Sequence, residues 1–168
     1  MAVSTTQSIW RSGGGDQTRV AYCGTAIMIA QFYVPDLTAA AGTNVLTASV
    51  ANGGVPVILP ANAVITSINI SMTVTGGTTP TMNMGVTGYA SGTKTNSGIL
   101  ANYPSATGKT IANWTTATAG SLLTTNPVST TEQVYITAGT GTGTAGTGTA
   151  TGYIHYFVID PYAGQQNV

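Results

Sequence analysis

The most regular pattern of apolar and polar positions in the chain lies between Val64 and Thr75. Side chains alternate there with a period of two, which is typical of a β-strand with one buried face. The predicted buried face holds Val64, Thr66, Ile68, Ile70, Met72 and Val74, and the opposite face holds Ile65, Ser67, Asn69, Ser71, Thr73 and Thr75. We expect the even-numbered face to be the largest contribution to the core, because each well-buried apolar side chain stabilises a fold by about 1.5–3 kcal/mol. The hydroxyl-rich face is a candidate for packing against a sister subunit.

The short apolar segment before this strand is bracketed by Pro56 and Pro60. Proline has no N–H group to donate to a neighbouring strand, so it is confined to strand edges and ends. Residues 57–59 are therefore predicted to form an edge segment that leads into the long strand.

Apolar residues also run from Ala26 to Val34, interrupted only by Gln31. This run is far too short to span a bilayer, so no membrane partner is expected. It is predicted to be a core strand within residues 19–34, which form one strand or a strand pair. A further short strand is expected over residues 44–50, before the turn at 52–54.

Two later stretches predict hairpins. Residues 81–87 alternate with Met82, Met84 and Val86 on one face, and they are expected to pair with the preceding long strand across the turn at 76–80. Residues 132–138 and 153–159 also have strand character, and the tract between them, 139–152, is almost wholly Gly, Thr and Ala. We expect an extended hairpin from Glu132 to Ile159 with this tract as its tip or loop.

The whole pattern predicts an all-β protein, a jelly-roll-like antiparallel β-sandwich with an extended N-terminal arm. Residues 88–126 carry only isolated apolar residues and are expected to be loop-rich, with short strands and one short helix near Ile99–Leu100. Residues 19–168 are predicted to form a single domain, which the arm of residues 1–18 precedes.

Composition adds a neutral, hydroxylic surface to this picture. Only 5% of the residues are charged, against about a quarter in ordinary globular proteins, and the formal net charge is zero. Threonine is more frequent even than the 22 glycines, and its β-branched side chain suits a pleated sheet. A neutral surface lacks the repulsion that keeps monomers apart, so this composition favours a protein that works in an assembly.

Cationic side chains are too scattered for a nucleic-acid partner, which would require several of them to act together. They are Arg11, Arg19, Lys94 and Lys109. The first residues do not have the pattern of a signal peptide, so we expect synthesis in the cytoplasm. The single cysteine, Cys23, is predicted to be a small buried hydrophobic residue.

Ionisable side chains do not predict an active site. The acidic residues Asp16, Asp36, Glu132 and Asp160 are far apart in the sequence. The only histidine, His155, shares a strand face with Tyr153 and Phe157, which indicates a packed, hydrogen-bonded histidine in the core or in an interface rather than a general base. No neighbouring His or Cys completes a metal site, so neither an enzyme nor a cofactor is predicted. Tyr153, His155 and Phe157 are candidates for an oligomer interface.

The N-terminal arm contains one bulky cluster, Ile9, Trp10 and Arg11, in a polar stretch broken by three glycines. Buried Trp and Arg dominate the binding energy of many interfaces, so this cluster is the predicted anchor on a partner. In the alternative, Trp10 folds back onto its own sheet.

The sequence L-P-A-N-A-V-I at residues 59–65, the alternating strand at 68–74 and T-M-N-M-G-V at 81–86 resemble small β-rich structural proteins of tailed bacteriophages. In those proteins a segment similar to residues 59–65 precedes a long alternating strand. In the strand that follows, an acidic residue usually occupies the position of Asn83. The resemblance covers residues 40–160 and includes virion decoration, cement, head-fibre and tail-associated domains.

This resemblance implies a jelly-roll-like capsid decoration protein, a cement protein of the virion. It would bind the capsid surface as a homotrimer, bridge neighbouring subunits of the major capsid protein and stabilise the capsid. The resemblance leaves open whether the protein belongs to the head or the tail.

A second interpretation is a phage fibre or tail-associated domain that binds a receptor or carbohydrate. The aromatic residues Tyr89, Tyr103 and Trp114 would then stack against sugar rings. Grouping of these side chains on an exposed surface favours recognition, whereas burial or dispersion favours the cement role.

Overall fold

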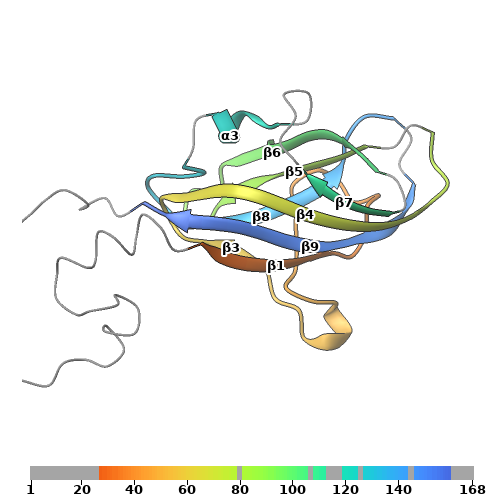
Figure 1. The fold of residues 1–168 in the computed structure, drawn as a ribbon, viewed down its shortest axis with the longest axis horizontal. Coiled ribbons are helices and arrows are strands. Elements are labelled where there is room, and N and C mark those ends of the chain that lie inside the picture. Colours follow the sequence, from red (N-terminus) through yellow and green to blue (C-terminus); the bar gives the residue numbers. More distant parts are fainter. Residues whose placement is uncertain are drawn as a thin grey trace, which may run out of the picture.

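The computed structural model describes residues 27–78, 81–105, 108–112, 119–124, 127–143 and 146–159. The regular secondary structure of these residues is almost all β-strand, with one short 3-10 helix and one short α-helix (Figure 1). The strands are β1 (Met28–Val34), β2 (Thr43–Asn44), β3 (Ile58–Leu59), β4 (Ala63–Thr75), β5 (Thr81–Gly88), β6 (Lys94–Pro104), β7 (Gly108–Ala112), β8 (Val134–Thr140) and β9 (Thr147–Val158). The helices are η1 (Val50–Asn52) and α3 (Ser121–Thr124). The predicted arm, residues 1–18, lies outside the described residues.

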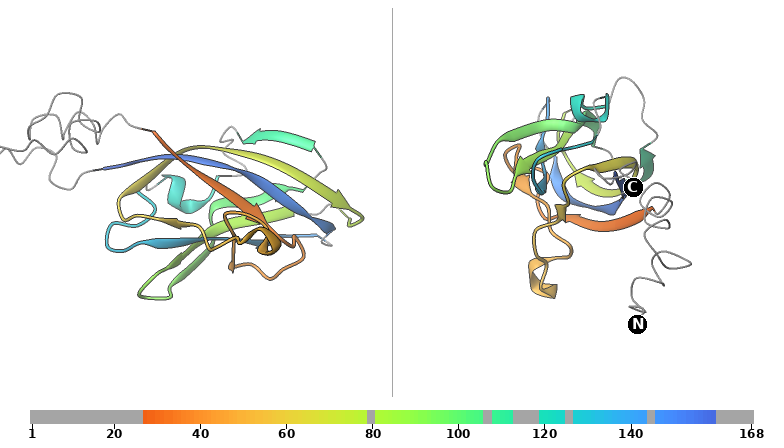
Figure 2. Two further views of the ribbon diagram at one scale, coloured as in Figure 1. Left: turned by 90° about the horizontal axis from the view of Figure 1, so that it is seen from below. Right: turned by 90° about the vertical axis from the view of Figure 1, so that its left-hand side faces the viewer.

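Two antiparallel sheets pack face to face. Sheet A has the strand order β1-β9-β4-β7, and sheet B has the order β2-β8-β5-β6, with β3 also paired to β8. Figure 2 shows the two layers from the side, with β1 and β9 in one and β5, β6 and β8 in the other. The predicted all-β antiparallel sandwich is confirmed, while the jelly-roll connectivity stays a prediction.

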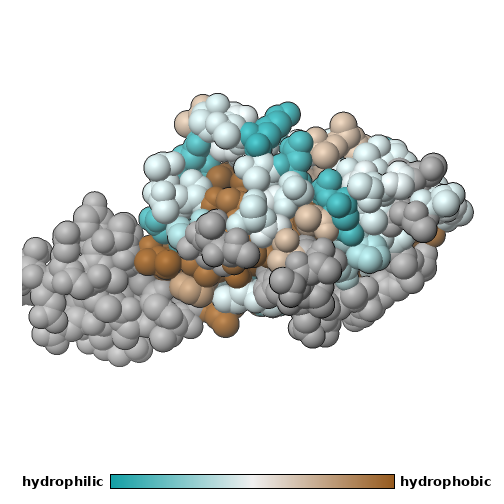
Figure 3. All heavy atoms as spheres, turned by 90° about the horizontal axis from the view of Figure 1, so that it is seen from above, coloured by the Kyte–Doolittle hydropathy of each residue, from teal (hydrophilic) through white to brown (hydrophobic). Residues whose placement is uncertain are grey.

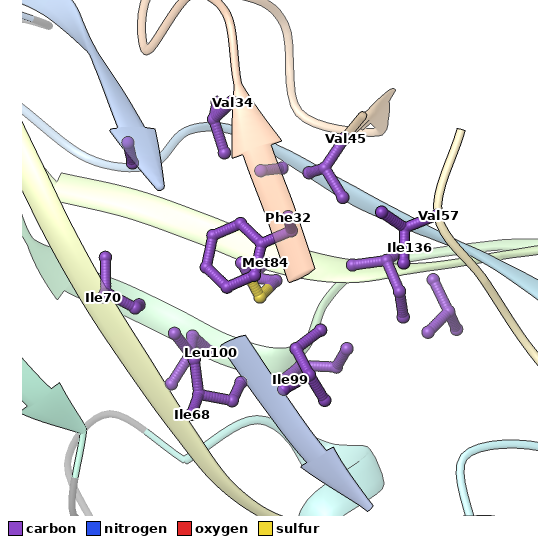
Figure 4. Packing of buried hydrophobic residues seen from close by; sticks show 14 of the residues in the cluster. Phe32, Val34, Val45, Val57, Ile68, Ile70, Met84, Ile99, Leu100 and Ile136 are labelled. Atoms are coloured by element: carbon purple, nitrogen blue, oxygen red, sulfur yellow. The ribbon is translucent and has the colours of Figure 1, made fainter. Parts of the chain in front are cut away.

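The core fills the space between the sheets. Buried apolar side chains of both sheets point into it (Figure 4); they include Phe32, Ile68 and Ile70 from sheet A and Met84, Ile99, Leu100 and Ile136 from sheet B. Gly152 of β9 lies opposite Phe32 in the β1–β9 ladder. A Cβ atom at Gly152 would collide first with the backbone carbonyl oxygen of Asn69 on β4, and it would also lie 2.8 Å from Phe32 Cζ, so the missing side chain makes room for both neighbours.

Strand β4 departs from the simple alternation expected for it. The β4–β9 ladder shifts between Ile65 and Ser67, so Thr66 is an extra, bulged residue. Ile65 therefore faces the core, whereas the prediction had Val64 and Thr66 facing inward. Beyond the bulge the prediction holds, since the buried residues are Ile68, Ile70 and Met72.

Strand β1 lies at the edge of sheet A, so its interpretation as a core strand is only half right. Phe32 and Val34 are fully buried, but Ile27 and Ile29 have exposed fractions of 60% and 61%. A run that is apolar on both faces suggested burial on both faces, yet only the even-numbered side chains reach the core.

Both predicted hairpins are wrong in their pairing. Strand β5 pairs with β6 and β8 in sheet B, not with β4. Likewise β8 belongs to sheet B, whereas β9 runs between β1 and β4 in sheet A. The Gly/Thr-rich tract thus supplies the end of β8, the start of β9 and the connection between the two sheets. The hairpin predictions failed because the local sequence determines which residues form strands but not which strands pair.

Two smaller predictions have opposite outcomes. The segment at 57–59 does flank the sheet, as β3, whose Leu59 is buried against β8. Ile99 and Leu100, expected near a short helix, instead lie in β6, and the α-helix of the described region begins later, at Ser121.

Candidate assembly surface

The outer side of sheet A carries an unusual set of exposed side chains. In β1 and β9 the odd-numbered residues point away from the core, and in β4 the odd-numbered residues do so after the bulge. We call the following outward-facing residues the sheet A face: Ile29, Gln31 and Tyr33 of β1, Tyr153, His155 and Phe157 of β9, and Val64, Ser67 and Asn69 of β4.

The strand register arranges this face in rows. Phe157 lies beside Val64, His155 lies between Ile29 and Ser67, and Tyr153 lies in the next row. Tyr153 has an exposed fraction of 46%, and Ile27 continues the apolar side of the face beyond β1. Seen from above the view of Figure 1, along the sheets and not onto the sheet A face, the described surface is mainly pale or teal, with some brown, apolar residues beside the grey segments (Figure 3). Contiguous exposed apolar groups of this kind typically mark an interaction site.

The imidazole of His155 is held by two polar side chains of β4. Its Nδ1 atom lies 3.0 Å from Ser67 Oγ and 3.4 Å from Asn69 Nδ2. With the nitrogen of the Asn69 amide placed towards the ring, Nδ1 is the acceptor of this pair, because an amide nitrogen can only donate. The prediction of a packed, hydrogen-bonded histidine is confirmed. Its position is on the sheet A face, beside Tyr153 and Phe157 as the strand pattern indicated.

A second polar feature closes the turn between β5 and β6. Glu132 Oε2 accepts hydrogen bonds from the backbone N–H groups of Ala90, at 2.6 Å, and Ser91, at 3.0 Å. The side-chain hydrogen bond with Ser91, followed by the two backbone bonds, lowers the pKa of Glu132. Next to this turn the rings of Tyr89 and Tyr135 stack with their centroids 5.2 Å apart.

The described acidic residues serve local structure. Asp36 Oδ1 accepts hydrogen bonds from the backbone N–H group of Thr38, at 2.8 Å, and from its hydroxyl, at 2.6 Å. These bonds, the side-chain one foremost, lower the pKa of Asp36. Among the residues that the structure describes, no three His, Cys, Asp or Glu side chains gather to hold a metal ion. None of the described helices has the length and apolar character of a membrane span.

Tyr89 and Tyr103, the two described residues among those considered for sugar stacking, do not share one exposed surface. Tyr103 has an exposed fraction of only 7%, so its ring packs in the core and that assignment is corrected. Tyr89 is exposed, at the end of sheet B. Trp114 and the arm cluster Ile9, Trp10 and Arg11 lie outside the described residues.

The sequence interpretation missed Ile27 and Ile29, which it assigned to the core. Their odd-numbered spacing with Gln31 was a usable signal, because a polar residue in step with them indicates the outward face. Comparison of the chain with protein-family models, curated proteins and solved structures finds no match.

Proposed function

We propose that this protein is a structural component of a bacteriophage virion, a cement or decoration protein that binds the capsid as a homotrimer and bridges subunits of the major capsid protein. The observation that carries the proposal is the sheet A face, whose nine defining residues are apolar or uncharged polar side chains and include no Asp, Glu, Lys or Arg. Such a face suits a permanent protein–protein contact, since charged residues are depleted at the centre of interfaces. The virion context rests on the resemblance carried by residues 59–65 and 81–86.

The three residues Tyr153, His155 and Phe157 would form the contact between subunits. Tyr153 supplies exposed aromatic area, and His155 is fixed in orientation by Ser67 and Asn69. Because a capsid lattice repeats the docking surface, one oligomer would make several contacts at once. Together these individually weak contacts would give a high affinity for the capsid. The arm residues Trp10 and Arg11 would reach the neighbouring subunit.

The decisive experiment mixes the purified full chain with capsids assembled without it and images the shells. Regular added density on the shell is the expected result. Loss of residues 1–15 should weaken this binding and leave the free oligomer intact. A folded oligomer that leaves such capsids bare would refute the cement role.

A matched pair of variants tests the surface. Tyr153→Lys places a charge on the sheet A face and should abolish the trimer, whereas Tyr89→Lys alters an equally exposed tyrosine of sheet B and should leave it unchanged. Sedimentation velocity measures both outcomes. Equal effects of the two substitutions would contradict the assignment of the interface.

One observation favours carbohydrate recognition as a second candidate. Tyr89 is 55% exposed while one side of its ring stacks on Tyr135, so the ring is rigid and accessible. Exposed rigid aromatics of this kind stack against sugars. Tyr89→Ala should then abolish retention on immobilised host glycans, and Tyr153→Ala should have no effect; retention that survives Tyr89→Ala would eliminate this candidate.

A further inference from the structure

The free edge of β1 is the only long sheet edge in the described residues that carries no device against pairing. Natural proteins protect sheet edges with short strands, lysines, prolines and bulges. Here β2 has two residues, and β7 contains Lys109. The fourth edge strand, β6, contains Lys94 and Pro104 and pairs with β5 through two register shifts. Residues 27–34 of β1 contain no charge, no proline and no bulge.

The backbone polar groups of this edge alternate in direction. Tyr33 N–H donates to the Leu46 carbonyl at 2.6 Å, and Leu46 N–H donates back at 2.9 Å, so Tyr33 directs its backbone groups away from β9. In an antiparallel ladder such directions alternate along the strand. Gln31 and Ile29 therefore direct their N–H and C=O groups outward too, and Ile27, the residue before β1, would continue this alternation. None of the three has a backbone hydrogen bond to another described residue on that side.

The side chains of this edge fit a second copy of the same strand. Ile27 and Ile29 are exposed on one face, and Met28 and Ala30 are half-buried on the other. Two such edges laid antiparallel would bring apolar residues together on both faces. Because the edge carries no charge, a charged partner segment would gain no ion pair there. An uncharged partner, such as a second copy of β1, is therefore favoured.

We propose that two copies of this chain pair through the antiparallel association of their β1 edges about a twofold axis, joining their A sheets into one continuous sheet. Outward-directed residues must lie opposite outward-directed residues, and Tyr33 is already paired with Leu46. The register that uses all three free positions is centred on Ile29, with Ile27 opposite Gln31 of the second copy. Exposed sheet edges bind extended partners by this strand addition.

This contact goes beyond the trimer of the proposed function. A twofold contact brings a surface against its own copy, whereas a threefold ring brings unlike surfaces together. Where both form, the β1 contact links neighbouring trimers. Ile29 also belongs to the sheet A face, so a charge there can weaken the trimer as well. The two proposals are separated by Tyr153, which lies on a central strand without a free edge, and by recovery in a mixture of opposite charges, which requires two copies of Ile29 to face each other.

Charge exchange at the symmetry axis tests the pairing. Ile29→Lys and Ile29→Glu each place like charges opposite one another, so each alone should weaken the association by about tenfold, and an equimolar mixture should restore it as a heterodimer. Sedimentation velocity of the full chain measures all three samples. A wild-type chain that shows no twofold association, or a mixture that fails to restore it, overturns the proposal.

Hydrogen exchange in the unmodified protein provides a readout that needs no substitution. At a concentration where nine molecules in ten are paired, the amides of Ile29 and Gln31 should exchange about tenfold more slowly than in the dilute protein, because only the unpaired tenth is open. The amides of Ala30 and Phe32, which face β9, should not change. Protection of Ile29 that is independent of concentration would mean that the chain's own residues cover the edge, and would overturn pairing between copies.

Discussion

Thr137 of β8 is fully buried, and its hydroxyl has no hydrogen-bond partner among the residues that the structure describes. An unsatisfied buried polar group destabilises a fold, whereas an apolar group of the same shape avoids that penalty. Thr137→Val should therefore raise the free energy of unfolding in urea by about 1 kcal/mol. The exposed Thr73→Val provides the control and should change stability little. A destabilised Thr137→Val variant would show that the hydroxyl has a partner in solution.

Glu132 makes the stability of the β5–β6 turn depend on pH. Its hydrogen bonds with Ser91 and Ala90 favour the carboxylate and lower its pKa, so the stabilisation is present above the unfolded-state pKa of about 4.3 and is lost as the pH falls through the folded-state pKa. Glu132→Gln should lower the melting temperature at pH 7, and the difference from wild type should narrow below about pH 4. Gln133→Glu is the control: it adds a carboxylate at the next position, and it should not reproduce the pH-dependent difference in melting temperature. A difference that is constant between pH 7 and pH 3 would contradict this account.

The bulge of β4 changes which residues of the strand face the core. Odd-numbered residues face the core before the bulge, and even-numbered residues face it after the bulge. Ile65 and Ile68 both face the core although three positions separate them, and Thr66 is the residue that the ladder skips. Without Thr66 the pairs on its two sides, Ile65 with Tyr156 and Ser67 with His155, would follow one another without interruption.

Deletion of Thr66 should therefore leave the fold intact. The expected loss in free energy of unfolding is about 1 kcal/mol, because the hydrogen bond from Thr66 Oγ1 to the His155 carbonyl is removed. Deletion of Ser71 should instead unfold the protein, since it moves Met72 to the outer face. Circular dichroism with thermal unfolding checks both variants, and equal damage from the two deletions would argue against the bulge.

The comparison of β4 with β8 and β9 shows what the sequence could predict. Alternation identified β4, β5, β8 and β9 and many of their buried residues, such as Met82, Ile136 and Ile70, because the side-chain period of a strand is local. It did not identify β6, which lies in the region expected to be loop-rich. Partner choice was predicted wrongly, since hairpin proximity does not determine whether a strand such as β9 crosses to the opposite sheet. For the assembly surface, the strand phase of His155 was enough to place it with Tyr153 and Phe157. Ile29 required knowledge of which strand forms the edge.

At the scale of the whole molecule, assembly is expected to depend on apolar area and on neutral hydrogen bonds. The chain has four Lys and Arg residues and four Asp and Glu residues in total, and none of the eight is among the residues that define the sheet A face. At 0.1 M, salt screens interactions between charges that are more than about 10 Å apart. The affinity of a contact without charges should therefore depend little on the salt concentration. Apolar association, by contrast, weakens on cooling, because its driving force near room temperature is entropic.

The association of the purified chain should thus change less than about twofold between low and moderate NaCl, and it should weaken when the solution is cooled towards freezing. Sedimentation equilibrium across a matrix of salt and temperature measures both dependences. Sulfate at equal ionic strength should strengthen association, since it is excluded from exposed apolar surface. A steep loss of association with NaCl, without an effect of cooling, would mean that the few charged residues form the contact and that the sheet A face remains open to solvent.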